Sequence, residues 1–452
     1  MTLGPHGFSW FKLEGAAAKP RVPDEVPLPG LEVNGSWKQI VARGGKSSLE
    51  KILPGYINAC RWFGGKGRNI RAVSLGEAIP IPVNSQETLM MAMDVLYADG
   101  QPEAYLLPLT FVTGDRAAEL QQAFPQAVIA RLKSKVAGEV TEGLLIDALY
   151  EREFLNTLLD AIARRRSFKN KAGEISATPS KLFRALTGPQ KSVLEPTVMR
   201  REQSNTSVVY GERLILKIFR RLQDGINPDL EIGRFLSEKS SFEHVPKLAG
   251  SLDLHRGRAG GTLGILHSWV RNEGDAWRYT LDHLADFFET CSAFTALPAD
   301  LLRPQGHVLD FIEREVPESV RETIATYLAP AALLGGRTGE LHLALAADRT
   351  DPDFAPEVFT PFYRRAIYQS MRTLADRVLT TLRDRLKHLP EGERAEAERV
   401  LTLKGEIVNR FRSLVDQKIA GVRIRVHGDY HLGQVLFTGK DFVITDFEGE
   451  PA

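Results

Sequence analysis

The decisive stretch of this chain reads HGDYHLGQ at residues 427–434 and DFE at residues 446–448. It places Asp429 two residues after a histidine, Gln434 five residues after that aspartate, and Asp446 after a short apolar segment. Phosphoryl transfer from a nucleotide requires an acceptor for the proton of the attacking hydroxyl, and an amide oxygen and a carboxylate for the metal. The stretch supplies all three groups, and it therefore predicts a phosphotransferase site.

The segment between these two parts is predicted to form a β-hairpin. Residues 435–438 and 442–445 are β-prone runs, and residues 439–441 between them are turn sequence. Because a tight hairpin returns the chain to its starting point, Asp446 is expected beside the preceding loop. The alternative is a surface hairpin with ordinary turn acids, which the spacing of the amide and the DF dipeptide disfavour.

An apolar strand far upstream carries one lysine. In residues 213–219, RLILKIF, Lys217 lies among apolar neighbours, and burying an ammonium is costly unless it is paired. Residues 227–236 read as a helix start with an acidic first turn, so we expect Glu231 to face Lys217. Such a strand-lysine and helix-glutamate pair holds the α- and β-phosphates in kinase folds. The alternative, a lysine that keeps an edge strand soluble, is disfavoured by the order of the motifs.

A polar turn precedes the lysine strand. Residues 202–211 are small and rich in hydroxyl groups, and they are a candidate phosphate-covering loop although they lack GxGxxG. A hinge is expected around residues 266–270, where backbone groups could hydrogen-bond the adenine edge. The nucleotide-binding candidates of these two segments are Ser204, Asn205, Thr206, Ser207, His267 and Val270.

These motifs together resemble the signature of bacterial maltokinases. Three other segments fit that family: RWFGGKGR at residues 61–68, NEGDAW at residues 272–277 and GELHLALA at residues 339–346. The resemblance runs from about residue 35 to the last residue. It implies an enzyme that uses ATP and Mg²⁺ to phosphorylate maltose at its anomeric hydroxyl. The product, maltose 1-phosphate, feeds glycogen and α-glucan synthesis from trehalose.

The resemblance also implies the fold, which is expected to be α+β. We expect a bilobal architecture like that of eukaryotic protein kinases and aminoglycoside phosphotransferases. Its parts are an N-terminal α/β cap subdomain at residues 35–135, a nucleotide-binding N-lobe at 136–270, and a mostly helical, incomplete C-lobe at 271–452. Residues 88–97 are predicted as a strand, residues 141–166 as an amphipathic helix, and residues 361–388 and 391–417 as two helices packed as a hairpin.

The expected roles follow the phosphotransferase interpretation. Asp429 accepts or orients the proton of the sugar hydroxyl, while Asp446 and Gln434 supply hard oxygen ligands for Mg²⁺. Lys217 clamps the phosphates and Glu231 steadies it. For three further residues the sequence leaves alternatives open: His427 braces the loop or contacts the sugar, His431 contacts the sugar or packs the loop, and Glu448 joins the metal shell or is an exposed acid.

The first residues resemble a different family. Residues 3–14 look like the closing strand of a trehalose synthase, and residues 15–34 read as a linker. Residues 1–34 are therefore expected to be a remnant of an upstream trehalose synthase plus a linker, with trehalose synthase as a partner in cis or in trans. In the family the chain continues beyond the position of Glu450-Pro451, so we expect exposed apolar surface in the helical part.

The composition argues against a nucleic-acid-binding or membrane protein. The chain has 58 basic and 57 acidic residues, which gives no general attraction to nucleic acid or to membranes. Two cysteines in 452 residues fit a reducing compartment, and no signal peptide or spanning segment is evident. These features predict a cytoplasmic protein.

Three other functions remain to be weighed. A protein kinase is disfavoured because the chain leaves no room for an activation segment after Asp446. A non-catalytic, kinase-like partner of trehalose synthase is the main rival. A kinase for another sugar or alcohol would keep the same phosphate machinery, since the preference for maltose rests on the resemblance alone.

Overall fold

The computed structural model describes residues 28–84, 86–188, 194–199, 204–256, 259–292, 310, 312 and 314–447, and the chain divides into two compact units. The first unit comprises the described residues up to Leu230 together with Leu248–Trp269. The second comprises Glu231–Lys247 and the described residues from Val270 onward. The expected trehalose synthase remnant, up to residue 27, and Glu448 lie outside the described residues. Sheets and helices in both units confirm an α+β fold.

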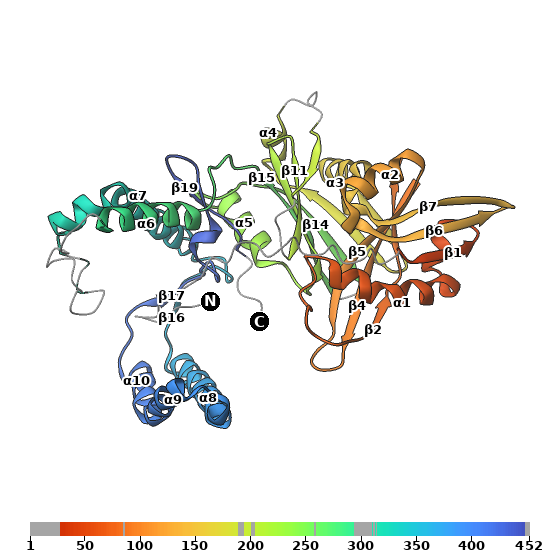
Figure 1. The fold of residues 1–452 in the computed structure, drawn as a ribbon. Helices are drawn as coiled ribbons and strands as arrows, with labels where there is room; N and C mark the ends of the chain where they lie inside the picture. The colour runs from red at the N-terminus through yellow and green to blue at the C-terminus, as the bar shows by residue number, and fades with distance from the viewer. Residues whose placement is uncertain are drawn as a thin grey trace. The chain divides into compact units, whose positions relative to one another are not determined.

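The N-terminal sheet of the first unit is built on two long central strands, with α1 (Arg43–Ala59) packed across one face (Figure 1). Its neighbours are antiparallel except for the parallel outer pair. In spatial order the strands are β1 (Gly30–Asn34), β6 (Val128–Val136), β7 (Glu139–Asp147), β5 (Glu103–Thr113), β4 (Gln86–Tyr97) and β2 (Ile70–Leu75). β3 (Ile79–Val83) also pairs with β4, β13 (Arg221–Leu222) pairs with β5, and α2 (Gly114–Ala123) follows β5.

The two central strands of this sheet, β4 and β5, are buried on both faces, which explains their nearly continuous apolar sequences. Along β4, Met91 and Met93 join the core beneath α1, while Met90 faces a second core. Successive side chains of a strand point to opposite faces, so a strand covered on both sides needs apolar residues at every position. The predicted strand at residues 88–97 is confirmed as part of β4.

A second, antiparallel sheet completes the first unit. Its order is β10 (Pro196–Val198), β11 (Asn205–Tyr210), β12 (Leu214–Phe219), β15 (Ala259–Ser268), β14 (Leu248–Arg256), β9 (Gly173–Pro179) and β8 (Ser167–Asn170). Helix α3 (Arg152–Ala163) buries Phe154, Leu158 and Ile162 in a core that also contains Ile81 of the first sheet and Leu216 of the second. The two sheets therefore share one core, and α4 (Phe183–Thr187) lies beside β14.

The helix predicted at residues 141–166 is wrong in its first half. That half is β7, which pairs with β5 and β6, and Asp147 then caps a short 3₁₀ turn by accepting a hydrogen bond from the Leu149 N–H at 3.1 Å. Helix begins only at Arg152. A strand buried on both faces shows a run of apolar residues that periodicity alone does not distinguish from a buried helix. As a result, the N-terminal sheet extends to Asp147, beyond the expected cap boundary at residue 135.

The second unit packs helices around a small β-hairpin. Helices α5 (Pro228–Glu238, whose first residues belong to the first unit), α6 (Ala276–Ser292) and α7 (Glu318–Leu345) surround β18 (Val435–Phe437) and β19 (Phe442–Ile444). The predicted hairpin is confirmed by three antiparallel pairs. Its core contains Phe235, Leu345, Val435, Phe442 and Ile444, all less than 5% exposed.

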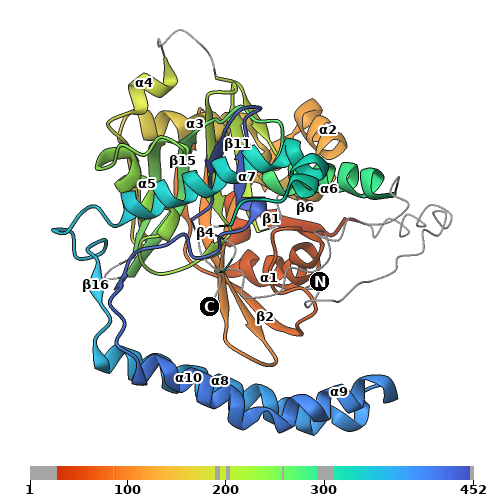
Figure 2. The ribbon, with the colours of Figure 1, turned by 90° about the vertical axis from the view of Figure 1, so that its left-hand side faces the viewer.

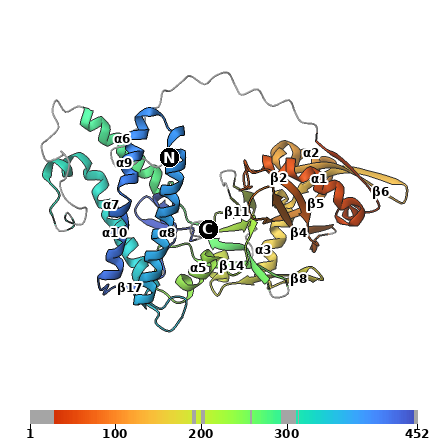
Figure 3. The ribbon, with the colours of Figure 1, turned by 90° about the horizontal axis from the view of Figure 1, so that it is seen from below.

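Three further helices lie in the chain between β16 (Glu357–Val358) and β17 (Val422–Arg423), which pair with each other. They are α8 (Pro361–Arg385), α9 (Glu391–Thr402) and α10 (Lys404–Asp416), and α8 runs alongside α10 (Figures 2 and 3). The predicted helix at residues 361–388 is confirmed, with a last 3₁₀ turn. The one predicted at 391–417 is two helices that meet at Leu403.

Apolar side chains are exposed in the helical part, as expected. On α6, Trp277, Leu281, Leu284 and Phe288 recur at helical spacing and are 42–58% exposed. No helix among the described residues combines the length and the apolarity that crossing a membrane requires.

Candidate active site

The loop that carries Asp429 turns sharply before it. Gly428 has a φ of +94°, a conformation that residues with a Cβ rarely adopt. The turn leaves the Asp429 side chain 35% exposed, so its carboxylate is accessible to solvent and to a substrate. The glycine of the HGD motif is therefore a backbone requirement of the loop.

The buried ring of His427 stabilises this loop. Its Nε2 lies 2.8 Å from the Thr445 carbonyl oxygen, and its Nδ1 lies 3.4 Å from the Asp429 amide nitrogen. Because a carbonyl accepts and an amide N–H donates, Nε2 carries the proton and Nδ1 accepts, which is the neutral imidazole. The ring also packs on Phe447, with centroids 4.6 Å apart. His427 thus joins the loop to the chain after the hairpin, which is the structural one of its two expected roles.

His431 lies on the exposed side of the same loop. Its Nδ1 accepts a hydrogen bond from the Gly433 N–H at 3.0 Å, which caps the 3₁₀ turn at Leu432–Gln434. Its Nε2 lies 3.8 Å from Oδ2 of Asp429, and the side chain is 54% exposed. Nδ1 therefore stabilises the loop, as the packing role requires, while Nε2 lies near the candidate catalytic carboxylate of Asp429.

The hairpin brings Gln434 next to the segment that contains Asp446. The Gln434 carbonyl accepts a hydrogen bond from the Thr445 N–H at 2.9 Å and another from its Oγ1 at 3.2 Å. Asp446 follows with a φ of +68°, an uncommon conformation for a residue with a Cβ and one that is often found at functional sites. Asp429, Gln434 and Asp446 thus belong to one small substructure, as the sequence predicts.

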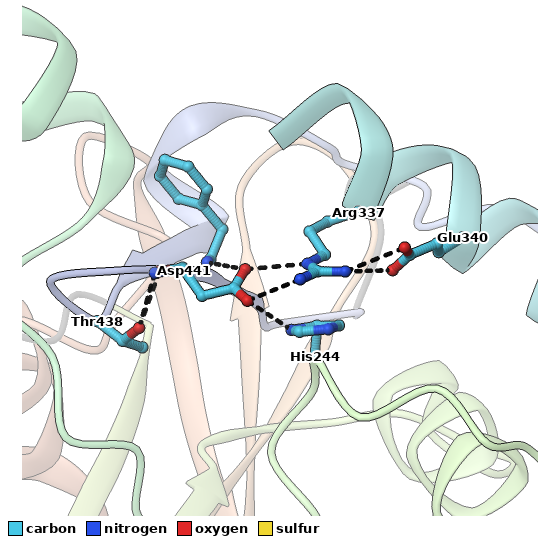
Figure 4. A network of polar contacts seen from close by, with 6 residues as sticks. His244, Arg337, Glu340, Thr438 and Asp441 are labelled. Atoms are coloured by element: carbon cyan, nitrogen blue, oxygen red, sulfur yellow. Dashed lines mark hydrogen bonds and ion pairs between the residues drawn. The ribbon is translucent and has the colours of Figure 1, made fainter. Parts of the chain in front are cut away.

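A polar network holds the tip of this hairpin (Figure 4). Arg337 of α7 donates from Nε and Nη2 to the two carboxylate oxygens of Asp441, at 2.9 and 2.8 Å, and also pairs with Glu340. The hydrogen bond from Arg337 lowers the pKa of the Asp441 carboxyl. His244 lies 3.7 Å from Asp441 and accepts at its carbonyl from the Ile444 N–H at 2.8 Å.

The other edge of the hairpin is held by backbone groups. The Glu273 N–H donates to the Phe437 carbonyl at 2.8 Å, and the Phe437 N–H donates to the Gly274 carbonyl at 2.9 Å. Glu273 and Gly274 belong to the NEGDAW segment. This segment and the hairpin, which are far apart in the sequence, are therefore neighbours in the structure.

The residues present fit a magnesium–nucleotide site. Among the described residues, no three His, Cys, Asp or Glu side chains gather as a metal-binding group. Gln434 is outside those residue types, and Glu448 is not described. Mg²⁺ is usually held by one or two protein oxygens together with phosphate oxygens and water. One carboxylate at Asp446 and one amide oxygen at Gln434 match that donor set.

The carboxylate beside Lys217 is Asp229, which corrects the expectation of Glu231. The Lys217 Nζ lies 3.8 Å from the buried Asp229 Oδ2 within the first unit. Glu231 pairs instead with Arg425, two residues before His427. Both acids lie in the first turn of α5, and a helix turns by about 200° over two residues. The sequence placed an acid in the correct turn but on the wrong side of the helix.

The other nucleotide-binding candidates occupy the second sheet of the first unit or the start of the second unit. In β11, Thr206 and Ser207 are buried and pair in register with Ile218 and Lys217 of β12. Ser204 and Asn205 lie at the start of that strand. His267 pairs with Ile215, and the Val270 carbonyl, where the second unit resumes, accepts from the Asn272 side-chain amide at 2.9 Å. Their part in nucleotide binding stays a prediction.

The sequence did not predict the buried ion pair that lies beside these strands. Arg220 and Asp147 form an ion pair at 2.6 Å with both side chains fully buried. An arginine directly after an apolar strand and an aspartate at the end of another were the available signals. Neither signal identifies the partner, because the two residues lie 73 positions apart in the sequence.

Comparison with known proteins identifies one part of the chain. Residues 56–150 match the family described as the maltokinase N-terminal cap domain, so the chain carries a maltokinase-type cap. A glucosamine kinase of Streptacidiphilus jiangxiensis is 26% identical over 299 residues, covering 65% of this chain and 55% of the relative. A glucosamine kinase of Mycolicibacterium smegmatis is 23% identical over 252 residues, covering 55% and 51%. The chain thus spans about half the length of these relatives.

Solved structures of glucosamine kinases are also similar to this chain. One is in complex with glucosamine, ADP and inorganic phosphate; its TM-score is 0.46 at 18% identity, over 88% of this chain and 72% of that one. A second, in crystal form B, has a TM-score of 0.49 at 18% identity, over 92% and 73%.

Proposed function

We propose, taking the maltokinase-type cap as the premise, that this chain is a sugar kinase that transfers a phosphoryl group from ATP to a sugar hydroxyl. The observation that carries the proposal is the joined loop and hairpin, in which an accessible Asp429 stands on the same small substructure as Gln434 and Asp446. The similarity to glucosamine kinases supports the same reaction class.

In this proposal Asp429 orients the sugar hydroxyl and accepts its proton. Its amide nitrogen lies 3.4 Å from Nδ1 of the buried His427 ring, so the loop that carries the carboxylate is anchored before the substrate arrives. Phosphoryl transfer passes through a loose transition state, in which alignment of the nucleophile counts more than strong deprotonation. A carboxylate that is correctly placed beside the hydroxyl is therefore sufficient.

Asp446 and Gln434 would hold Mg²⁺, whose charge neutralises the nucleotide phosphates when it is bound. Lys217 of the first unit would bind nucleotide phosphates, with Asp229 rather than Glu231 holding its ammonium in place. The phosphate-covering role of residues 204–207, the hinge role of His267 and Val270, and the metal role of Glu448 are proposed alongside.

The sugar is proposed to be maltose, phosphorylated at its anomeric hydroxyl. The cap domain supports maltose, whereas the curated relatives are glucosamine kinases and favour glucosamine as a second candidate. A coupled ADP-release assay with maltose, glucosamine and glucose separates the two. A kcat/KM for maltose far above those for glucosamine and glucose supports maltose as the substrate. Equal rates on maltose and glucose would contradict the proposal that the substrate is a disaccharide.

The alternative function is that of a non-catalytic, kinase-like partner module of trehalose synthase. One variant distinguishes it from a sugar kinase. Asp429→Asn keeps the shape of the side chain but removes its capacity to accept a proton. We expect its kcat to fall about 10²- to 10⁴-fold, the usual contribution of general base catalysis. Tight binding to trehalose synthase by a wild-type chain that turns over no sugar would support the rival.

A further inference from the structure

Arg220 lies where one run of chain passes from one sheet of the first unit to the other. It directly follows β12 of the second sheet and directly precedes β13, which is paired with β5 of the cap sheet. The Arg220 carbonyl accepts a hydrogen bond from the Leu106 N–H of β5 at 2.7 Å. Lys217 is three residues upstream on the same run. The strand that carries the candidate phosphate-binding lysine is therefore continuous with the cap.

The side chain of Arg220 contacts three separate segments. Its Nη2 lies 2.6 Å from Oδ2 of Asp147 at the end of β7, and both side chains are fully buried. Its Nε donates to Oγ1 of Thr206 in β11 at 2.8 Å. Its Cζ lies 4.8 Å from the ring centroid of Trp62, in the RWFGGKGR motif of the cap. One guanidinium thus joins two parts of the cap to the hairpin of β11 and β12.

The charge on this buried guanidinium is balanced by Asp147 of the cap sheet. Burial is the largest single influence and lowers the pKa of Arg220, but the charge of Asp147, its contact with the guanidinium and the nearby Tyr56 and Tyr150 together raise it. The bond to Thr206 is therefore a charge-assisted hydrogen bond in a water-poor site, a stronger class than a neutral one.

The contact at Thr206 acts next to the proposed nucleotide residues. Thr206 pairs with Ile218 and the adjacent Ser207 pairs with Lys217. A shift of β11 relative to β12 would therefore displace Ser207 from Lys217. Arg220 opposes such a shift because it belongs to the chain of β12 and binds a side chain of β11.

We propose that Arg220 is a positioning residue through which the cap domain fixes the β11–β12 hairpin for nucleotide binding. This inference rests on the proposed function, because it assigns to that function's nucleotide site a requirement for the cap. In this arrangement Trp62 and Asp147 hold the guanidinium in place, and the guanidinium in turn fixes Thr206 of β11.

The test compares ADP affinity with thermal stability in matched variants of the full chain. Arg220→Lys keeps the charge but loses the Nε donor, and Thr206→Val keeps a β-branched strand residue but loses the acceptor. For each we expect the Kd for Mg·ADP, measured by calorimetry, to rise about tenfold, the effect of one lost charge-assisted hydrogen bond. The KM for ATP should rise by a similar factor while the KM for the sugar stays near wild type.

Two further variants separate positioning from stability. Leu120→Ala, in the apolar core around α2, should lower Tm without changing the Kd of the folded protein. The double variant Arg220→Met with Asp147→Leu replaces a buried ion pair with apolar groups, which often restores stability. We expect it to regain Tm but not ADP affinity.

The outcomes distinguish this inference from the proposed function. A wild-type chain that binds no ADP would overturn the function. A wild-type chain that binds ADP, with Arg220→Lys and Thr206→Val binding equally well, would overturn the positioning role alone. A double variant that regains affinity together with Tm would also overturn it, because Arg220 would then serve folding only.

Discussion

His427 shows how one buried side chain sets the geometry of an exposed one. It uses both ring nitrogens, one on the Thr445 carbonyl and the other on the Asp429 amide. The sequence left its role open because an HxD spacing fits a substrate contact as well as a brace. Burial favours the brace, since the ring is only 2% exposed.

The His427 brace is tested by comparing it with His431. His427→Ala leaves the Thr445 carbonyl without this partner, which should lower the free energy of unfolding by about 1–3 kcal/mol and also lower kcat. His431→Ala, at a half-exposed site, should cost well under about 1 kcal/mol of stability. Chemical denaturation of both variants gives the two values. Equal losses would contradict the bracing role.

Asp348 provides a prediction about acid stability. Hydrogen bonds from the Thr350 hydroxyl and the Thr350 and Asp351 amides, together with the charge of Lys239, lower its pKa from 3.8 to about 2. A carboxyl with a depressed folded-state pKa stabilises the fold above its unfolded pKa, and this stabilisation is lost as the pH falls through the folded value.

The expected pH window for Asp348 therefore lies between about 4 and about 2. Tm measured from pH 6 to pH 2 should fall less steeply in that window for Asp348→Asn than for the wild type. The two curves should run parallel above pH 5, where the carboxyl is ionised in both states. A wild-type curve as flat as that of the variant would contradict the lowered pKa.

At the scale of elements, the β18–β19 hairpin was predictable and its attachments were not. The β-prone runs, the turn and the return to Asp446 all follow from about twelve consecutive residues, and local sequence carries that information. Arg337 and His244 come from distant parts of the chain, so nothing near the hairpin predicts them. The helix wrongly predicted at residues 141–166 failed for the related reason that burial on both faces comes from tertiary packing.

The Arg337–Asp441 pair is expected to stabilise the hairpin and hence the proposed metal ligands. Arg337→Gln removes a bidentate, partly buried pair, which should cost about 1 kcal/mol or more. We expect faster amide hydrogen exchange in residues 435–447 and a higher Mg²⁺ concentration for half-maximal activity. Arg399→Gln, which breaks the exposed pair with Glu396 on α9, is the matched control and should change neither. Unchanged exchange in the hairpin of Arg337→Gln would show that the backbone contacts suffice.

For the whole molecule, the sequence predicted the loop and hairpin of the candidate site but not the partners of its charges. Lys217 was expected to pair with Glu231, and the structure places Asp229 beside it. Which residue of a helix turn faces a strand depends on how the helix docks, and the acidic turn alone does not specify that. The buried Arg220–Asp147 pair joins segments that only the folded first unit brings together.

The two compact units have separate apolar cores, so we expect core substitutions to act locally. Leu53 of α1 and Leu345 of α7 are both 0% exposed, the first in the core of the cap and the second in the core around the hairpin. Leu→Ala at either position should cost about 2–5 kcal/mol, because the change leaves a cavity. Native-state hydrogen exchange should then show lost protection mainly in β4 and β5 for Leu53→Ala, and mainly in β18, β19 and α7 for Leu345→Ala. Equal loss of protection throughout the chain for both variants would mean that the two cores unfold as one cooperative unit.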